Sequence, residues 1–398
     1  MSVVNPPPSV VWPPPAVVWP LVNLAGAATV VSPEPGVVAS WDREGRLVTL
    51  VDGGVTFKRA LDSSVKARWS ACGARQRRDL PPPEAVGVFE RSRAVAARVL
   101  ERLPGGAVGR EARDRLTVEV LPWTPERLLG EGERFRAAYP LPIAILPPDS
   151  YADVVLQATH GCTWNRCTFC NFYQGTGFQV LSETEFLGHA ARVKALLGRG
   201  AELRRGVFLA EGNALALGNA RLEPLLRLAR EAFPGRPLRA FLDVLTGSRH
   251  GEPDWPRLKA LGLERVHIGL ETGDDELLGF LNKPGSAAEA LRLTGALKAA
   301  GLSVTLIVMV GVGGREWRAA HRAATLSVLR AMPLTNRDLV YLSPFVEHPD
   351  SRYTLDRVAR GLTAMSGLEV EAELSSLSLE LRGFGLKAAR YDIREFIY

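Results

Sequence analysis

The chain has 398 residues, of which 46% are hydrophobic and 23% are charged. This length suits two domains better than one, and the composition is that of a globular protein and excludes a disordered or collagenous one. The formal net charge is +6, which permits an anionic or nucleic-acid partner without requiring one. No run of 18 apolar residues is free of proline and charge, so the sequence predicts no transmembrane helix and no membrane partner. The four cysteines form no disulfide framework and suit the reducing cytoplasm, where we expect the protein to reside.

The first 35 residues are rich in proline and contain a short repeat, Pro-Pro-Pro-Ser-Val-Val-Trp-Pro followed by Pro-Pro-Pro-Ala-Val-Val-Trp-Pro. Proline at this density breaks helices and favours extended chain. We therefore predict that residues 1–35 form a poorly ordered arm. A proline motif that binds a partner protein is the alternative interpretation.

Residues 36–125 are predicted to form a small α+β module. Turn signals at Asp42–Gly45 and Asp52–Gly54 separate short apolar runs that are typical of strands. A helix is expected over about 83–103, because apolar residues recur there at helical spacing before a Pro-Gly-Gly stop. Residues 126–150 are expected to be a linker. Cys72 in this module is interpreted as a small hydrophobic residue, because it is a lone cysteine.

From residue 151 the pattern changes to six short β runs that alternate with helices. Two helix starts carry a capping pattern, at Ser182 and at Ser286. Such alternation predicts an α/β fold with a parallel sheet, here an open (βα)6 barrel over 151–345, followed by a short C-terminal extension over 346–398. Functional residues of such sheets lie at the carboxyl ends of the strands. The six predicted strands are Val154–Ala158, Gly206–Ala210, Leu238–Val244, Arg265–Gly269, Ser303–Val310 and Leu339–Leu342.

Three cysteines within nine residues follow the first of these strands. They are Cys162, Cys167 and Cys170, in the order His160-Gly-Cys162-Thr-Trp164-Asn-Arg-Cys167-Thr-Phe169-Cys170. Structural zinc takes four ligands, and a [4Fe–4S] cluster usually takes four thiolates. Three thiolates leave one metal position open for a ligand that is not protein, which favours chemistry over scaffolding. A zinc site completed by a distant ligand such as His160 is the alternative.

The Cys-x4-Cys-x2-Cys loop, with an aromatic residue before its last cysteine, resembles the signature of radical S-adenosylmethionine (SAM) enzymes. Most of that superfamily has three residues between the first two cysteines, whereas this chain has four, which fits a less-studied branch. The resemblance covers about Asp153 to Phe345. It implies a radical SAM barrel, a [4Fe–4S] cluster bound by the three cysteines, and S-adenosylmethionine as the second cofactor.

The resemblance also implies roles for residues that follow the predicted strands. Phe169 is placed to pack against the adenine, and the segment with Glu211 and Gly212 corresponds to one that holds the SAM amino group. Ile268-Gly-Leu-Glu271-Thr-Gly273 resembles the family's Gly-Leu-Glu-Ser-Gly segment, in which Glu271 would bind the ribose hydroxyls or the amino group. Gly311, Gly313 and Glu316 belong to a glycine-rich loop that would let the backbone approach the adenine or the methionyl tail.

Other polar residues near strand ends have no assigned role at this point. Asp243, Thr246 and Ser248 could contact SAM or substrate, or cap a helix. Glu347 and His348 could face substrate or be solvated. His267, inside the fourth strand, could point toward a substrate or form a hydrogen bond in the core. No residue is assigned to hydrogen transfer.

The expected reaction is reductive cleavage of SAM to methionine and a 5′-deoxyadenosyl radical, which takes a hydrogen atom from an unidentified small-molecule substrate. An electron donor such as flavodoxin or ferredoxin is expected as a partner. A radical SAM enzyme that modifies tRNA, other RNA or a peptide is one alternative. A non-catalytic iron–sulfur electron carrier or sensor is the other.

Overall fold

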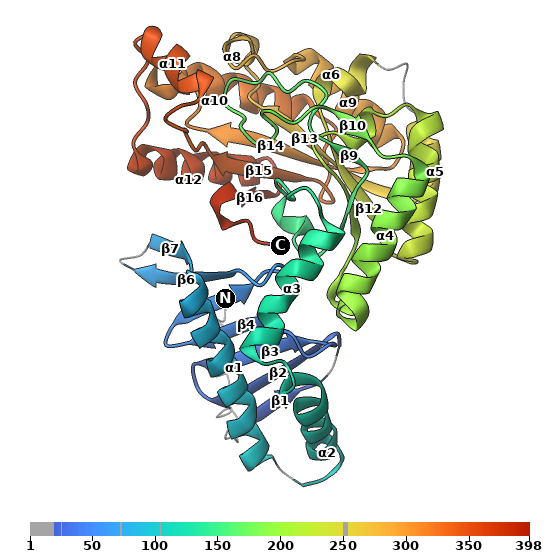
Figure 1. The fold of residues 1–398 in the computed structure, drawn as a ribbon. Helices are drawn as coiled ribbons and strands as arrows, with labels where there is room; N and C mark the ends of the chain where they lie inside the picture. The colour runs from blue at the N-terminus through green and yellow to red at the C-terminus, as the bar shows by residue number, and fades with distance from the viewer. Residues whose placement is uncertain (1–19, 25, 72–73, 104, 250–253) are drawn as a thin grey trace, which may run out of the picture. The chain divides into compact units, whose positions relative to one another are not determined.

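The computed structural model describes residues 20–24, 26–71, 74–103, 105–249 and 254–398. The chain divides into two compact units, Met1–Gly130 and Glu131–Tyr398, and passes from one to the other within helix α3 (Pro125–Ala138) (Figure 1). Residues 1–19 of the predicted arm and Cys72 lie outside the described residues.

The first unit contains a seven-stranded antiparallel sheet in which each strand pairs with the next along the chain. Short turns such as Asp42–Gly45 and Asp52–Gly54 connect neighbouring strands, as expected from their turn-forming residues. The strands are β1 (Leu21–Asn23), β2 (Ala28–Glu34), β3 (Val37–Asp42), β4 (Leu47–Asp52), β5 (Val55–Arg59), β6 (Val65–Ala71) and β7 (Ala74–Asp79).

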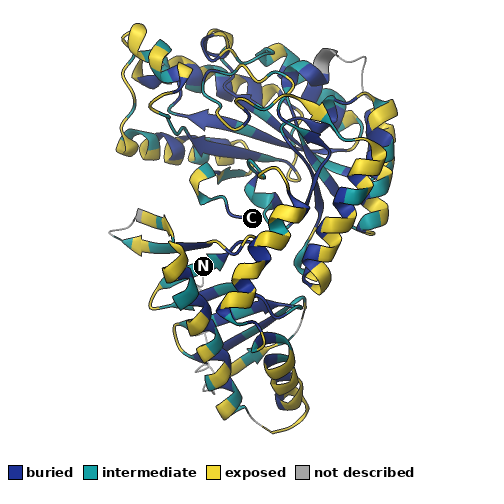
Figure 2. Cartoon of the chain, viewed as in Figure 1, coloured by how far each residue is buried: buried dark blue, intermediate teal, exposed yellow. Residues whose placement is uncertain are grey.

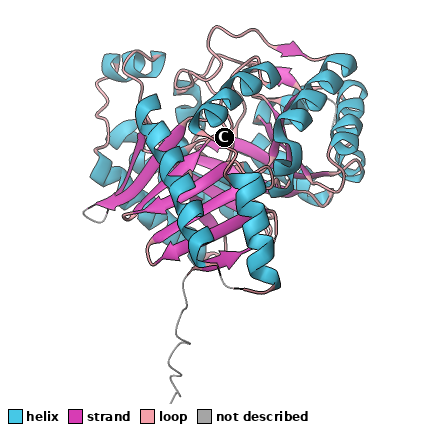
Figure 3. Cartoon of the chain, turned by 60° about the horizontal axis from the view of Figure 1, so that its bottom comes forward, coloured by secondary structure: helices cyan, strands magenta, loops and turns pink. Residues whose placement is uncertain are grey.

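One face of this sheet is covered by α1 (Pro82–Arg102), close to the predicted helix bounds (Figure 3). The apolar side of the helix, including Phe89 and Val95, packs with Trp41, Leu47 and Leu50 of the sheet to form the core of this unit. After α1 come α2 (Ala107–Asp114) and a π-helical turn, η1 (Arg115–Val120).

The predicted arm over residues 1–35 is wrong for its last part, because β1 and β2 are strands of this sheet. Proline dominates only the first 20 residues, and beyond them come short apolar runs with β-branched residues, such as Thr29–Val31, that suit a strand. Thr29 and Val31 of β2 are buried while Val30 between them is partly exposed, and Val31 joins the core.

The second unit is built on a seven-stranded sheet in which every pair of neighbouring strands is parallel. Its order is β16-β15-β14-β13-β12-β11-β8, so the sheet is open between β16 and β8. The six predicted strands are present as β8 (Val154–Gln157), β11 (Val207–Ala210), β12 (Leu238–Leu242), β13 (Leu263–Glu271), β14 (Ser303–Val310) and β15 (Leu339–Pro344).

The sheet has one strand more than the six predicted. β16 (Ala388–Arg390) lies in the C-terminal segment and pairs in parallel with β15, after the crossover helix α12 (Gly367–Gly383). Its three residues, Ala-Ala-Arg, carry no apolar alternation that would mark a strand. Pairing with the free edge of β15 therefore stabilises the strand conformation of this segment.

Helices follow the strands of the sheet and bury one side against it, while their outer sides are exposed (Figure 2). The expected capping box is present at Ser182, and Ser286 caps its helix by accepting a hydrogen bond from the Glu289 amide. The remaining helices are α4 (Glu183–Leu197), α5 (Asn219–Ala232), α6 (Val244–Arg249), α7 (Trp255–Ala260), α8 (Asp275–Phe280), α9 (Ala287–Ala299), α10 (Gly314–Ala331) and α11 (Arg352–Ala359).

The open side of the sheet is bridged by the end of the chain. The Tyr391 hydroxyl donates a hydrogen bond to the Leu146 carbonyl over 2.8 Å. The Tyr398 hydroxyl accepts one from the Val155 amide of the edge strand β8 over 2.9 Å. Strand edges carry unpaired backbone groups, and Tyr398 satisfies one of them on β8, while Tyr391 fixes the loop at Leu146. Among the residues that the structure describes, no helix has the length and apolar character needed to cross a bilayer.

Candidate active site

The three clustered cysteines lie on one loop between the short strands β9 (Thr159–His160) and β10 (Gln179–Val180), which pair with each other. The Asn165 side-chain amide ties this loop together by donating to the carbonyls of Tyr173 and Thr176, over 2.8 and 3.2 Å. Cys162, Cys167 and Cys170 are all free thiols, each is partly exposed, and all three line one cavity.

The loop is also anchored to the segment that follows α8. The Thr168 amide donates to the Leu281 carbonyl over 3.0 Å, and the Trp164 indole donates to the Asn282 carbonyl over 2.8 Å. The Asn282 side chain returns a hydrogen bond to the Arg166 carbonyl. These contacts hold the middle of the loop, between Cys162 and Cys170, over the carboxyl end of β13.

A close backbone approach at Gly212 fixes the start of the loop. A Cβ atom at this position would lie 2.9 Å from the Gly161 carbonyl oxygen and 3.2 Å from the Cys162 Cβ. The segment after β11 therefore packs against the cysteine loop only because residue 212 is glycine. Gly212 also lines the cavity, so this predicted residue lies beside the cysteines.

Glu211, the neighbouring predicted residue, is buried and is not among the residues that line the cavity. Its carboxylate accepts hydrogen bonds from the Gln157 side chain, the Tyr173 hydroxyl and the Ala144 amide, over 3.0, 3.3 and 3.3 Å. Burial raises the pKa of this carboxyl. Since Tyr173 belongs to the cysteine loop, Glu211 is placed to hold the loop rather than a ligand.

Glu271 ends β13 at a bulge and has a left-handed backbone, with φ 60°. This conformation turns its carboxylate back over Gly269, where a Cβ atom would lie 2.4 Å from the Glu271 Oε1. The Lys283 ammonium donates to the same oxygen over 3.2 Å. Both side chains are largely buried and both residues line the cavity.

Lys283 was not predicted as a site residue. Burial lowers the pKa of this ammonium, but the charges of Glu271, Cys167 and Asp243 outweigh burial and raise its pKa overall. Lys283 follows α8 in the segment Leu-Asn-Lys-Pro, which carries no catalytic pattern. Its proximity to the cysteines results from the anchoring of the loop to Leu281 and Asn282, which are distant from the cysteines in the chain.

Asp243 lies at the carboxyl end of β12 and lines the cavity beside these residues. It accepts hydrogen bonds from the Thr246 amide and hydroxyl and from the Asn213 side chain. The Asn213 amide also donates to Thr163 and Thr246, over 3.2 and 3.0 Å. Asp243 and Thr246 thus belong to one hydrogen-bond network at the strand end, while the side chain of Ser248 lies outside the described residues.

Phe169 is partly buried against an apolar cluster that includes Leu277, Phe280 and Met309, and it lines the cavity. His348 also lines the cavity, whereas Glu347 forms an ion pair with Arg357 over 2.8 Å. The other lining residues are Ile145, Asn171, Phe172, Tyr173, Phe241, Leu242, Gly269, Ile307, Met309, Ser343, Pro344, Phe345, Val346, Tyr391 and Ile393.

Besides Glu211, three more of the predicted cofactor-binding residues lie outside the described lining of this cavity. Gly311 approaches Val370 of α12, and the Gly313 amide donates to the Tyr353 hydroxyl over 2.9 Å. The exposed Glu316 carboxylate accepts a hydrogen bond from the Thr363 amide over 2.9 Å, which lowers the pKa of this carboxyl. The glycine-rich loop therefore contacts the C-terminal segment of the unit.

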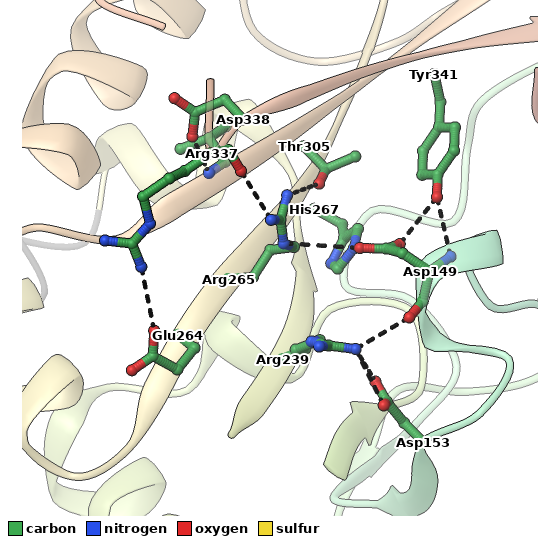
Figure 4. Close-up of polar contacts among 11 residues, drawn as sticks. Asp149, Asp153, Arg239, Glu264, Arg265, His267, Thr305, Arg337, Asp338 and Tyr341 are labelled. Atoms are coloured by element: carbon green, nitrogen blue, oxygen red, sulfur yellow. Dashed lines mark hydrogen bonds and ion pairs between the residues drawn. The ribbon is translucent and has the colours of Figure 1, made fainter. Parts of the chain in front are cut away.

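His267 belongs to a separate polar network deeper in the sheet (Figure 4). Its Nε2 lies 3.1 Å from the Asp149 carboxylate, which also accepts from the Tyr341 hydroxyl over 3.1 Å. Arg265 reaches the same carboxylate at 3.6 Å, and Arg239 donates to Asp153 over 2.8 Å. Of the two readings left open for His267, the structure therefore shows the hydrogen bond in the core.

The donor set of the cavity fits an iron–sulfur cluster. Burial raises the pKa of the Cys167 thiol to about 12 and also raises that of Cys170, whereas a bound metal cation would deprotonate both. Among the described residues, no group of three or more His, Cys, Asp or Glu side chains is spaced to hold a single metal ion. A [4Fe–4S] cluster does not need such a group, because each thiolate binds a different iron.

The family model for the Radical SAM superfamily matches residues 156–326. The matched residues contain the cysteine loop and the strands β11 to β14, so this part of the chain is similar to the radical SAM superfamily. The superfamily and the α/β fold class predicted from the sequence are confirmed, and with them the class of enzyme and its two cofactors, a [4Fe–4S] cluster and S-adenosylmethionine.

Solved structures give further matches. The radical SAM methyltransferase TsrM from Kitasatospora setae has 16% sequence identity and a TM-score of 0.41, over 52% of this chain and 39% of that one. Coproporphyrinogen III oxidase (HemN) from Escherichia coli has 16% identity and a TM-score of 0.42, over 64% and 56%. Methylornithine synthase (PylB) has 15% identity and a TM-score of 0.40, over 78% and 85%. The chain spans about two fifths of the length of TsrM. Among curated proteins, none matches this chain.

Proposed function

We propose that this protein cleaves S-adenosylmethionine reductively with one [4Fe–4S] cluster held by Cys162, Cys167 and Cys170. The observation that carries this proposal is the common cavity, which three thiols share with the carboxylates of Asp243 and Glu271 and with the Lys283 ammonium. When bound and reduced, the cluster supplies the electron that breaks the C5′–S bond of SAM, giving methionine and a 5′-deoxyadenosyl radical that takes a hydrogen atom from the substrate.

The residues around the cysteines have distinct parts in this proposal. Glu271 accepts hydrogen bonds from the ribose hydroxyls or from the amino group of SAM, since a carboxylate can accept several. Lys283 holds the Glu271 carboxylate and balances the negative charge of the thiolates, which is consistent with its raised pKa. Asp243 offers a second carboxylate to the cationic cosubstrate, and Phe169 packs against the adenine.

The remaining predicted residues act on the position of the loop. Gly212 allows the segment after β11 to approach Cys162, and Glu211 holds the loop through Tyr173. Gly313 donates to the Tyr353 hydroxyl, and the Tyr353 amide donates to the Thr168 carbonyl beside Cys167. In this proposal, Gly311 and Glu316 contact the C-terminal segment through Val370 and Thr363, and they do not contact SAM.

The proposal includes a small-molecule substrate that enters the cavity beside SAM. It also includes a one-electron donor of the flavodoxin or ferredoxin kind, because the cluster must be reduced before each cleavage. Both partners fit the reducing environment of the cytoplasm that the cysteine content suggests.

The test is anaerobic reconstitution of the full chain with iron and sulfide, followed by iron and sulfide analysis and a visible absorption spectrum. We expect about four irons per chain and a change in the spectrum of the cluster when SAM is added. Cys162→Ala, Cys167→Ala and Cys170→Ala should each lose the cluster, while Cys72→Ala, the matched control, should keep it. Loss of iron in Cys72→Ala, or a cluster that survives all three other changes, would contradict the proposed ligand set.

A further inference from the structure

The cavity continues past the charged residues into a part whose walls are mainly apolar. We call this part the apolar chamber and define it by Ile145, Phe241, Ile307, Ser343, Tyr391 and Ile393. Phe241 is the inward residue of β12 that precedes Asp243, and Ile307 pairs with Gly269, which precedes Glu271. Side chains on one face of a strand recur at every second residue. Phe241 and Ile307 therefore form a floor of the chamber that lies one such step below the carboxylates of Asp243 and Glu271.

The walls of the apolar chamber on the open side of the sheet come from two segments that are fixed to each other. Ile145 adjoins Leu146, whose carbonyl accepts the hydrogen bond from the Tyr391 hydroxyl. Tyr391 is buried and its amide donates to the Leu342 carbonyl. The hydroxyl of Tyr391 is thus already engaged, and the chamber offers a ligand mainly carbon surface.

The cations nearest to the floor of the chamber are engaged elsewhere. Arg239 and Arg265 turn to Asp153 and Asp149 in the network of Figure 4, and neither belongs to the lining of the cavity. Among the described residues that line the cavity there is no arginine, and Lys283 is bound to Glu271. The charged lining, apart from the thiols, is therefore two carboxylates and one bound ammonium, and His348 adds an imidazole.

We propose that the apolar chamber receives an uncharged, mainly apolar portion of the substrate and discriminates against carboxylates, sulfonates and phosphates. This inference rests on the proposed function, because it places the portion of the substrate next to the cosubstrate. An anion in the chamber would lose its hydration without meeting a free cation, whereas an apolar group would lose only unfavourable contact with water. Substrates that present a phosphate there, such as nucleotides or RNA, do not fit.

The test uses two fluorescent probes that differ by one anionic group. N-phenyl-1-naphthylamine is neutral, and 8-anilinonaphthalene-1-sulfonate carries a sulfonate on the same aromatic skeleton. With the full chain purified anaerobically, we expect saturable binding of the neutral probe and binding of the sulfonate that is at least about tenfold weaker. Equal binding of both probes, tighter binding of the sulfonate, or no binding of the neutral probe would overturn the inference.

Two variants locate the probe. Ile393→Arg should weaken binding of the neutral probe and strengthen binding of the sulfonate, because it puts a cation into the wall of the chamber. Ile145→Arg should do the same, and serves if the first variant fails to fold. Leu379→Arg changes an exposed leucine of α12 and should leave both affinities unchanged. If Ile393→Arg and Ile145→Arg are folded and neither alters binding, the probe lies elsewhere and the inference is wrong.

Saturating SAM separates the chamber from the site of the cosubstrate. We expect SAM to change the affinity of the neutral probe less than about threefold, and complete displacement would assign the chamber to SAM and overturn the inference. The probe measurement needs no cleavage of SAM. If no 5′-deoxyadenosine forms but the neutral probe is clearly preferred, the proposed chemistry is refuted and the inference about the chamber stands. If 5′-deoxyadenosine forms but the neutral probe is not preferred, only the inference about the chamber is refuted.

Discussion

Two groups of charged residues lie on the same parallel sheet, and they differ in their interaction partners. His267 and Glu271 are four residues apart on β13. His267 joins a network in which Asp149 is the shared partner of His267, Arg265 and Tyr341, and none of these residues lines the cavity. Glu271 has one charged partner and lines the cavity. A buried polar residue of this sheet is therefore a candidate for ligand binding where it also lines the cavity, as Glu271 does and His267 does not.

The largest expected effect is at Glu271. Glu271→Gln keeps the shape of the side chain but removes the negative charge that faces Lys283 and the proposed cosubstrate. We expect formation of 5′-deoxyadenosine to fall roughly 100-fold, with the cluster and the fold retained, because the residue acts on the bound cosubstrate. Iron analysis and chromatography of the products check this, and an unchanged rate would remove Glu271 from the site.

The matched change in the network around Asp149 should lower the stability of the fold and should not lower the rate of SAM cleavage. His267→Phe keeps a ring of similar size but removes the contact with Asp149, so we expect the free energy of unfolding to fall by about 2 kcal/mol. The rate of SAM cleavage per folded molecule should change less than about threefold. Denaturant unfolding and the product assay measure the two quantities. A variant of unchanged stability that no longer cleaves SAM would make His267 a functional residue and end the contrast with Glu271.

The pH dependence of stability offers a second check on the network around Asp149. Burial raises the pKa of Asp149, but the charges of His267, Arg265 and Arg239 outweigh it and lower the pKa from 3.8 to about 2. A carboxyl whose pKa is lowered by folding stabilises the protein above its unfolded pKa, and this stabilisation is lost as the pH falls through the folded pKa. The contribution of about 2 kcal/mol should therefore disappear between about pH 4 and pH 2.

Comparison with Asp149→Asn isolates this contribution, because the variant cannot titrate at this position. Burial raises the pKa of the neighbouring Asp153, which gives a slope of opposite sign in both proteins, and only the smaller part that comes from the Asp149 charge is lost in the variant. The difference in unfolding free energy between the two proteins should shrink as the pH falls from 4 to 2 by roughly that amount. A constant difference over this range would mean that the network does not hold the Asp149 carboxylate in its ionised form.

The smallest effect concerns the backbone approach beneath the cysteine loop. Gly212→Ala would place a Cβ atom 2.9 Å from the Gly161 carbonyl oxygen, so the loop must shift by a few tenths of an ångström. We expect about a tenfold loss in the rate of SAM cleavage, because the cysteines and the carboxylates lose their relative positions. Gly218→Ala is the control, since a Cβ atom there meets nothing within 4 Å. Equal rates in the two variants would show that the close approach has no effect on the site.

The sequence predicted the parts of this site that local patterns encode. Six apolar runs and two capped helices identified the open parallel sheet, and the spacing of Cys162, Cys167 and Cys170 identified the loop. Glu271 and Gly212 were predicted from a resemblance to segments at strand ends, and both line the cavity. The close contact of Gly212 with Gly161 explains why that position needs a glycine, which the sequence alone does not show.

What the sequence did not predict depends on contacts between distant segments. Lys283 reaches the cysteines because Thr168 and Trp164 bond to Leu281 and Asn282, and no local pattern marks such contacts. The strand β16 and the wall at Tyr391 and Ile393 depend on the free edge of β15. Glu316 looked like a residue of the glycine-rich strand end, but its carboxylate turns to the Thr363 amide. The partner of a side chain is a property of the fold, which composition and spacing specify only in part.

The most direct test of the central claim is the formation of 5′-deoxyadenosine. The anaerobically reconstituted chain would be reduced and given SAM, and the products would be separated by chromatography, with Cys167→Ala treated in parallel. The account predicts 5′-deoxyadenosine and methionine in equal amounts from the native chain and neither from the variant. A native chain that holds its cluster, shows no change in the spectrum of that cluster with SAM and forms no 5′-deoxyadenosine would contradict it.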